Sequence, residues 1–336
     1  MAIGVGYPST ATRVGGELGG YHLVSELGAG GMGVVYLGEH RLLGRRAAVK
    51  TIRPEIAADP SFGRRFQLEA MAIAGLDHPS IVRLYDFAHD GDLPYMVMEY
   101  VTGRTLQDLL ADHPVLEPPG VLSLLTPVAA ALDHAHAHGV IHRDVKPGNI
   151  LVADDGRVLL MDFGLACLQD FTMATDPSCF LGTPEYVAPE QITGRPLTGT
   201  ADIYSLAALI FEAVSGRRPF TGKSWIEVAS QRLTMEPPLA RGVPADFARA
   251  LATGMMIDPL QRPRTAIELL ARLAAALRAA PTRAALELKS PEPGGAATVG
   301  VTAACLAGLV AANELLVLQA SFVHVGALIA INWPGH

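Results

Sequence analysis

The sequence predicts an α+β fold of two lobes, in which a small strand-rich lobe with one helix precedes a larger helical lobe. Short runs of β-branched and aromatic residues separated by turn residues fill about the first hundred positions, a pattern that is typical of strands. From about residue 105 to residue 280 the apolar residues instead recur at helical spacing. Hydrophobic residues make up 50% of the 336 residues, which is enough for a substantial core.

In the first lobe we expect five strands, a glycine-rich turn and one helix. The strands are expected over residues 21–27, 34–37, 47–52, 81–88 and 95–100. The helix is expected to begin at Asp59-Pro60, because Asp caps helices and Pro is tolerated in the first turn. It should end near Leu76, since His78-Pro79 follows.

In the second lobe the spacing of apolar residues predicts six helices. They are expected over residues 106–110, 120–138, 202–215, 225–232, 244–256 and 265–279. Residues 1–20 are rich in Gly, Ser and Thr, and we expect a flexible arm there. Residues 281–298 contain several Pro and Gly residues and are predicted to be a linker.

Composition excludes some classes of function. The formal net charge is -7 and no basic stripe interleaved with aromatic residues occurs, so we expect no nucleic-acid partner. The three cysteines, Cys167, Cys179 and Cys305, are scattered and odd in number, which favours a reducing compartment over a disulfide framework. Residues 1–21 lack a basic patch followed by an apolar run, and we therefore expect no cleavable signal peptide.

The end of the chain is an apolar tail that we expect to be helical. Glu314 is the only acidic or basic residue other than histidine between residues 299 and 333. A bilayer core needs about 20 mostly apolar residues of helix, and residues 299–318 and 315–331 are overlapping candidates. No Lys or Arg follows Lys289, so the positive-inside rule keeps the preceding part in the cytoplasm. The sequence predicts a single-pass anchor in the cell membrane; the alternative is one or two helices packed on the protein or a partner.

One short stretch gathers most of the chemically active side chains. Asp144, Lys146 and Asn149 lie within six residues, and Asp162 follows on the next turn of the chain. Two carboxylates, an amide and a lysine suit the transfer of a phosphoryl group from a metal-bound nucleotide to a hydroxyl. Such a transfer needs a positioned nucleophile, metal ligands and positive charge around the migrating group, with little covalent help from the protein.

Residues 142–151 resemble the catalytic loop of Ser/Thr protein kinases, and residues 162–164 resemble their metal-binding turn. The resemblance implies that Asp144 is the base or orienter of the substrate hydroxyl. It also implies that Lys146, the Ser/Thr-type choice at its position, neutralises charge on the γ-phosphate of ATP.

The same resemblance implies a metal site. It assigns Asn149 and Asp162 to one or two Mg²⁺ ions, with Mn²⁺ as an alternative. Both ions are hard cations that prefer oxygen ligands, which these two side chains offer.

A glycine-rich turn precedes these motifs. Gly28, Gly30 and Gly33 have a spacing that also opens dinucleotide-binding folds, where a helix follows the glycines. Here the β-branched and aromatic run of residues 34–37 follows, so the glycines are expected to join two strands. In protein kinases such a turn covers the phosphates, because bare backbone can approach their oxygens closely.

Lys50 lies in an apolar strand, where a lysine is costly to bury unless it is paired. Glu69 shares one helix face with Phe62, Phe66 and Ile73, which makes it a carboxylate on the core-facing stripe. Lys50 and Glu69 resemble the kinase ion pair in which the lysine holds the α- and β-phosphates. The alternative is a solvated Glu69 at the rim of the stripe.

Residues 95–103 resemble the hinge between the two lobes of a kinase. The resemblance places Met98 beside a back pocket and the backbone of Glu99 and Val101 against adenine. It also implies that Val35 and Ala48 sandwich the base and that Leu27 is a further nucleotide contact.

Residues 182–190 resemble the substrate-docking end of the kinase activation segment. This implies a protein substrate, because small-molecule kinases of related fold lack the segment. The resemblance also implies that Glu190 pairs with Arg262, and that Asp202 braces the backbone of the catalytic loop.

The hydroxyls of Thr172, Thr175 and Ser178 lie between the metal-binding turn and the docking segment. Arg143 precedes Asp144, a pattern associated with activation by loop phosphorylation. A phosphate carries about -1.5 to -2 charge at pH 7 and pairs well with Arg. We therefore expect autophosphorylation at Thr172 or Thr175, although the sequence does not decide among the three hydroxyls.

Over residues 21–280 the chain resembles a bacterial eukaryotic-like (Hanks-type) Ser/Thr protein kinase of the membrane-anchored, receptor-kinase-like subgroup. The resemblance implies transfer of the γ-phosphate of ATP to Ser/Thr hydroxyls of proteins in bacterial signalling, and it leaves a homodimer open. One alternative is a nucleotide-binding pseudokinase scaffold, against which the intact Lys50, Asp144, Asn149 and Asp162 speak. The other is a small-molecule phosphotransferase. The sequence names neither the substrates nor the activating signal.

Overall fold

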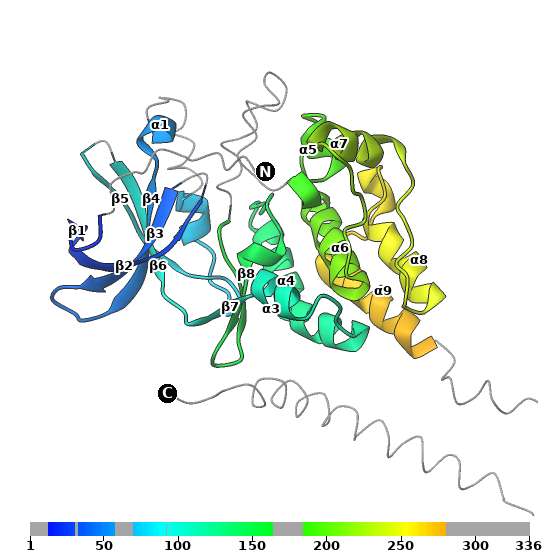
Figure 1. The fold of residues 1–336 in the computed structure, drawn as a ribbon, viewed down its shortest axis with the longest axis horizontal. Coiled ribbons are helices and arrows are strands. Elements are labelled where there is room, and N and C mark those ends of the chain that lie inside the picture. Colours follow the sequence, from blue (N-terminus) through cyan, green and yellow to red (C-terminus); the bar gives the residue numbers. More distant parts are fainter. Residues whose placement is uncertain (1–12, 31–32, 58–69, 92, 164–183, 280–336) are drawn as a thin grey trace, which may run out of the picture. The chain divides into compact units, whose positions relative to one another are not determined.

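A computed structural model describes residues 13–30, 33–57, 70–91, 93–163 and 184–279 (Figure 1). The chain divides after residue 278 into two units, and the first holds all the described residues except Ala279. The predicted linker and apolar tail lie outside the described residues. In the part of the chain that is described, no helix is both long and apolar enough to cross a membrane.

The first lobe is built on an antiparallel sheet of six strands in the order β1-β2-β3-β4-β6-β5. The strands are β1 (Glu17–Leu18), β2 (Tyr21–Ala29), β3 (Gly33–His40), β4 (Arg46–Ile52), β5 (Leu84–Asp90) and β6 (Leu93–Glu99). One face buries an apolar cluster that includes Leu23, Tyr36, Val49 and Val97. Side chains alternate across a strand, and a second, smaller cluster of Ile52, Ala70 and Met96 is also buried.

The predicted strands all overlap observed ones, but the strand expected from residue 81 starts only at Leu84. Ile81 forms an isolated parallel bridge to Leu160 of the second lobe, and its neighbours bond there too. Leu160 donates its N–H to the Ser80 carbonyl (2.8 Å) and accepts the Val82 N–H (3.0 Å). A short helix, α1 (Pro54–Ala57), was not predicted. Most of the helix expected over residues 59–76 lies outside the described residues, although residues 70–74 are helical.

The second lobe contains a small antiparallel sheet in the order β7-β8-β9 and helices that Figure 1 shows grouped together; α3 and α4 lie between β7 and β8 in the chain. The strands are β7 (Gly103–Thr105), β8 (Ile150–Ala153) and β9 (Val158–Leu160). The helices are α3 (Leu106–Asp112), α4 (Pro118–Ala137), α5 (Pro189–Ile192), α6 (Thr200–Ser215), α7 (Trp225–Thr234), α8 (Ala245–Gly254) and α9 (Ala266–Ala279). The two-lobed α+β prediction is confirmed.

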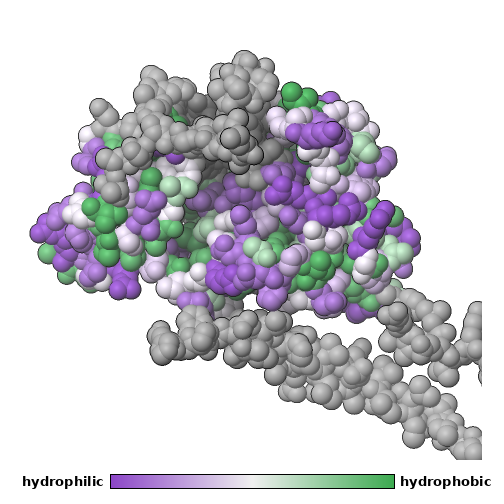
Figure 2. Space-filling view, in the orientation of Figure 1, coloured by the Kyte–Doolittle hydropathy of each residue, from purple (hydrophilic) through white to green (hydrophobic). Residues whose placement is uncertain are grey.

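Helix α6 forms the centre of the helical lobe. Every residue from Ala201 to Phe211 is buried, as expected for a helix that is apolar nearly all round. Gly216 ends the helix in the left-handed conformation (φ 67°), which Gly adopts without steric cost. On the surface, hydrophilic and hydrophobic residues are interspersed over the face shown in Figure 2.

The predicted pair of Glu190 and Arg262 is confirmed. Both side chains are buried, and the two guanidinium Nη atoms donate to the two carboxylate oxygens at 2.6 and 2.8 Å. Arg262 also donates to the carbonyls of Met256 (2.7 Å) and Thr200 (2.9 Å). A buried ion pair needs such additional bonds to offset desolvation. The pair therefore fastens α5 to the segment that precedes α9.

We predict that Glu190→Gln lowers the free energy of unfolding by about 3–5 kcal/mol, because it leaves the Arg262 charge buried without its partner. Urea unfolding of the variant and of the unmodified chain measures this loss. Arg272→Gln is the control: it breaks the exposed pair with Glu268 (2.6 Å) and should cost about 0.3–0.5 kcal/mol. Equal losses in the two variants would contradict the prediction.

Candidate active site

The loop between α4 and β8 is held by one buried carboxylate. Asp202, fully buried in the first turn of α6, accepts the backbone N–H of His142 (2.8 Å) and of Arg143 (2.7 Å). The ring of His136 lies 2.7 Å from the same carboxylate. A buried charge must be satisfied in this way. The predicted bracing of the loop by Asp202 is thus confirmed, whereas the part of His136 was not predicted.

The protonation of Asp202 follows from these contacts. Burial by itself would raise the pKa of Asp202, but the hydrogen bond and the charge of His136 outweigh burial and hold the pKa below its usual value. Asp202 therefore stays ionised and keeps accepting both loop amides.

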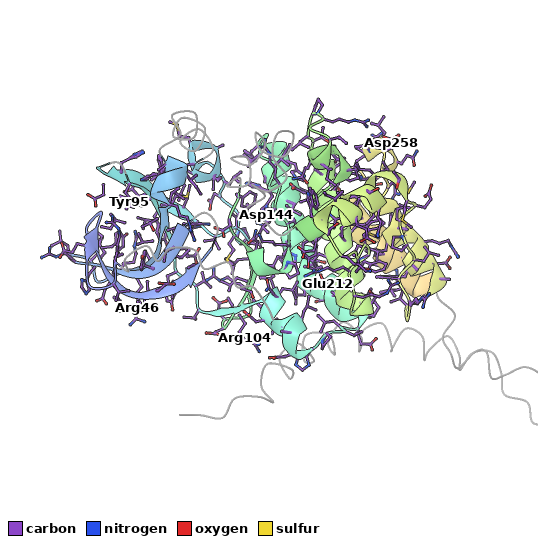
Figure 3. The ribbon with its side chains drawn as sticks, turned by 45° about the horizontal axis from the view of Figure 1, so that its top comes forward. Arg46, Tyr95, Arg104, Asp144, Glu212 and Asp258 are labelled. Carbon is purple, nitrogen blue, oxygen red and sulfur yellow. The ribbon has the colours of Figure 1, made fainter. Side chains whose placement is uncertain are left out.

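The loop brings three predicted residues together. The Asp144 carboxylate accepts a bond from Lys146 Nζ (2.6 Å) and one from Asn149 Nδ2 (2.9 Å). The turn Pro147–Asn149 makes this possible because it folds Asn149 back, so that Nδ2 also reaches the Asp144 carbonyl (2.8 Å). Asp144, labelled in Figure 3, lies where the sheet lobe meets the helical lobe.

Lys50 and Asp162 form the other half of the site. Lys50 Nζ on β4 lies 2.7 Å from Asp162 Oδ1, just after β9, and the lysine is only 7% exposed. Burial would raise the pKa of Asp162, but the charge and hydrogen bond of Lys50 outweigh burial and lower the pKa. Glu69, the predicted partner of Lys50, lies outside the described residues.

His142 joins the two halves. Its Nδ1 accepts the Asp144 N–H (3.2 Å), so Nε2 carries the proton and donates to the Met161 carbonyl (3.0 Å). Its ring packs 4.5 Å from the Phe163 ring. Arg143 and Asp162, on either side of this junction, have positive φ (67° and 61°), which is uncommon outside Gly.

The glycine-rich turn joins β2 and β3, as predicted. The Gly30 N–H donates to the Gly33 carbonyl (2.9 Å). A Cβ on Gly33 would lie 1.7 Å from the Thr51 carbonyl oxygen, so the sheet itself requires this glycine. A Cβ on Gly28 or Gly30 would instead meet open space.

The hinge strand β6 pairs with β4, which places Met98 opposite Ala48 and Met96 opposite Lys50. On the other side of β4, Val35 pairs with Lys50. Met98 lies beside a pocket of largely apolar lining. The lining residues are Ile73, Val82, Leu84, Met96, Met98, Asp162 and Phe163.

The docking segment reaches the catalytic loop through Gln191, which sequence reasoning missed. Gln191 accepts the Ala188 N–H (3.0 Å) and donates to the Arg143 carbonyl (2.9 Å). Arg232 was also missed: it is buried on α7 and donates to the Val187 carbonyl (2.8 Å). Arg232 shares the buried face of α7 with Ala229, three residues earlier, which becomes clear only from the structure.

Comparison with known proteins gives the class to which this fold and site belong. A family model described as protein kinase domain matches residues 21–273. The chain belongs to the protein kinase family.

Two bacterial relatives are Ser/Thr protein kinases. PrkC of Bacillus subtilis (strain 168) is 37% identical over 252 residues, which cover 74% of this chain and 39% of PrkC. PknB of Mycobacterium tuberculosis (strain H37Rv) is 37% identical over 263 residues, covering 75% of this chain and 42% of PknB. The chain therefore spans about two fifths of the length of these relatives. The resemblance to bacterial Ser/Thr kinases is confirmed.

The crystal structure of the Mycobacterium tuberculosis PknI kinase domain is similar in fold. It has a TM-score of 0.65 at 30% identity, and the match covers 79% of this chain and 99% of that structure. The likeness supports the two-lobed assignment independently of the motifs.

We predict that Asp202→Asn lowers the free energy of unfolding at pH 7 by about 1.5–3 kcal/mol, because charge-assisted bonds are lost. The pKa of Asp202 is depressed in the folded protein, so its contribution is present above its unfolded pKa of about 3.9 and fades as pH falls through the lower, folded value. Urea unfolding at pH 7, 5 and 3.5 should show the difference from the unmodified chain shrinking only at the acidic end. A difference that is the same at all three pH values would count against it.

Proposed function

We propose that this chain is an ATP-dependent Ser/Thr protein kinase, which transfers the γ-phosphate of Mg-ATP to Ser and Thr hydroxyls of proteins. The observation that carries the proposal is the shared contact of Lys146 and Asn149 with the Asp144 carboxylate, at 2.6 and 2.9 Å. This cluster brings the carboxylate of Asp144, the ammonium of Lys146 and the amide of Asn149 together at one point. The relatives at 37% identity support the same activity.

Asp144 orients the acceptor hydroxyl and takes its proton. Its carboxylate is about a third exposed (30%), so a hydroxyl can reach it. Lys146 stands 2.6 Å away and supplies positive charge where the migrating phosphoryl group gains negative charge. Nucleophile and charge are therefore fixed by neighbouring side chains of one loop.

Asn149 and Asp162 fit a hard divalent cation. The bonds of Asn149 Nδ2 to Asp144 assign the amide orientation, which leaves the Asn149 oxygen as a ligand. Asp162 adds an ionised carboxylate, since its pKa is lowered. Bound Mg²⁺ or Mn²⁺ supplies charge neutralisation to the phosphate oxygens.

The phosphates lie between the glycine-rich turn and Lys50. Neither packing nor a positive φ explains Gly28 and Gly30, because a Cβ on either would meet open space. A close approach of phosphate oxygens to the backbone does explain them. Lys50 holds the α- and β-phosphates, with Glu69 as a further partner for its charge.

The adenine ring lies against side chains of strands β3 and β4. Val35 on β3 and Ala48 on β4 sandwich the base, and Leu27, which is 45% exposed, covers its outer edge. The backbone of Glu99 and Val101 bonds to it. The side chain of Glu99 is not needed for this, because it pairs with Arg157 (3.2 Å).

The remaining proposals concern regulation and location. The kinase domain spans residues 21–280, and residues 281–298 link it to a membrane anchor at residues 299–333, with the domain in the cytoplasm. The near-absence of charge after Lys289 supports the anchor.

Autophosphorylation at Thr172, Thr175 or Ser178 activates the loop, supported by the Arg143 that precedes Asp144. A pseudokinase scaffold finds no support in the relatives.

We predict that Asp144→Asn lowers transfer of labelled γ-phosphate from Mg-ATP to casein by about 10²- to 10⁴-fold, because the base or orienter is lost. Nucleotide binding should persist. The control is Asp155→Asn, whose exposed carboxylate pairs with Arg157 (2.8 Å) and should leave transfer unchanged. Unchanged transfer in the Asp144 variant would refute its role. Binding without transfer in the unmodified chain would favour the scaffold.

We predict that the full chain sediments with membranes in detergent-free buffer, whereas a chain ending at Lys289 stays soluble and transfers phosphate equally well. Differential centrifugation and the casein assay measure both properties. A soluble full chain would indicate that the tail packs on the protein or on a partner.

A further inference from the structure

Arg232 of α7 is a charged side chain enclosed within the helical lobe. It is 1% exposed and is the largest of the fully buried side chains among the described residues. Arginine is almost never fully buried unless it is paired, because desolvating its charge costs several kcal/mol. A well-packed apolar residue would fill the same space at lower cost, so the contacts of the guanidinium need an explanation.

Those contacts are backbone carbonyls of the docking segment. Arg232 Nη1 donates to the Val187 carbonyl (2.8 Å), and Nη2 donates to the Glu185 carbonyl. The carbonyl between them, that of Tyr186, accepts the Ser205 hydroxyl of α6 (2.8 Å). Three successive carbonyls are therefore held by side chains of two helices, which fixes the path of the segment.

Both of these guanidinium bonds go to the backbone of the docking segment. The carboxylate of Glu185 bonds to Arg218 (2.6 Å), and that of Glu212 accepts the Tyr186 hydroxyl. Burial lowers the pKa of Arg232, and the charge of Glu185 partly offsets this effect. The planar fork of Arg reaches two carbonyls at once, whereas the single ammonium of Lys is a point charge.

The held segment continues directly to the catalytic loop. Ala188, one residue beyond Val187, donates its N–H to Gln191 (3.0 Å). Gln191 in turn donates to the Arg143 carbonyl (2.9 Å), next to Asp144. A displacement of residues 185–187 would therefore change where a docked protein presents its hydroxyl.

We propose that Arg232 is a positioning residue for the protein substrate, which fixes the docking surface of residues 184–188 through the carbonyls of Glu185 and Val187. The inference rests on the proposed kinase function and deepens it by assigning α7 to the recognition of protein acceptors. Its bonds described above go to the docking segment and not to Lys50 or Asp162. Loss of Arg232 should therefore weaken the acceptor and spare ATP.

The test uses the full chain with Arg232→Met, Arg232→Lys and, as a matched control, Arg249→Met on the exposed face of α8. Initial rates are measured against casein at saturating Mg-ATP, and against Mg-ATP at fixed casein. Arg232→Met should raise KM for casein by about ten- to hundredfold, the loss of two hydrogen bonds. KM for ATP should stay within about twofold, because the lysine–carboxylate pair is untouched. The KM of Arg232→Lys for casein should lie between those of Arg232→Met and the unmodified chain. Arg249→Met should match the unmodified chain in both KM values.

Several outcomes would overturn the proposal. Equal increases in both KM values, or a loss confined to kcat, would indicate a general structural role. Full recovery with Arg232→Lys would show that the fork is not needed. Circular dichroism checks folding, and if Arg232→Met is unfolded, Arg232→Lys decides alone. An unmodified chain that transfers no phosphate overturns the proposed function and this inference with it, whereas an active chain with a silent Arg232→Met overturns the inference only.

Discussion

The candidate site depends on a carboxylate that would not itself contact substrate. Asp202, buried at the start of α6, fixes two consecutive amides of the catalytic loop and contacts the ring of His136. Because every residue of α6 from Ala201 to Phe211 is buried, the loop takes its position from the core of the lobe. The short turn that follows then needs only local bonds to bring Lys146 and Asn149 to Asp144.

The charges of the site are likewise paired by side chains within the protein. Each carboxylate that the proposed chemistry uses has a lysine within 2.7 Å: Lys146 for Asp144, and Lys50 for Asp162. The first pair belongs to one loop, whereas the second joins the two lobes. The pairing with Lys50 lowers the pKa of Asp162 and keeps that acid ionised without a bound ligand. When a nucleotide binds, its phosphates can replace the carboxylates as partners of the lysines. The lysines then exchange one negative partner for another, which limits the cost of desolvation on binding.

Sequence predicted most of this arrangement because its motifs are local. The loop chemistry at Asp144 and the strand-joining glycines follow from short motifs whose residue types have few other uses. The pairing of Glu190 with Arg262 was implied by the resemblance to protein kinases. The sheet β7-β8-β9 was missed, because strands of three or four residues are too short to show alternation. Residues 81 and 82 were placed in a strand of the first lobe because apolar periodicity cannot tell which sheet an extended segment joins. The bonds of Arg232 and Gln191 depend on tertiary contacts, which spacing alone does not reveal.

The three glycines of the turn between β2 and β3 are needed for different physical reasons, and this affects how mutations at these positions are interpreted. Gly33 is required by the close passage of the Thr51 carbonyl, whereas Gly28 and Gly30 have open space around them. A side chain at position 33 would push β3 away from β4 and disturb Lys50 on the way. Inactive alleles at position 33 therefore report on sheet assembly, and only alleles at positions 28 and 30 report on the ligand.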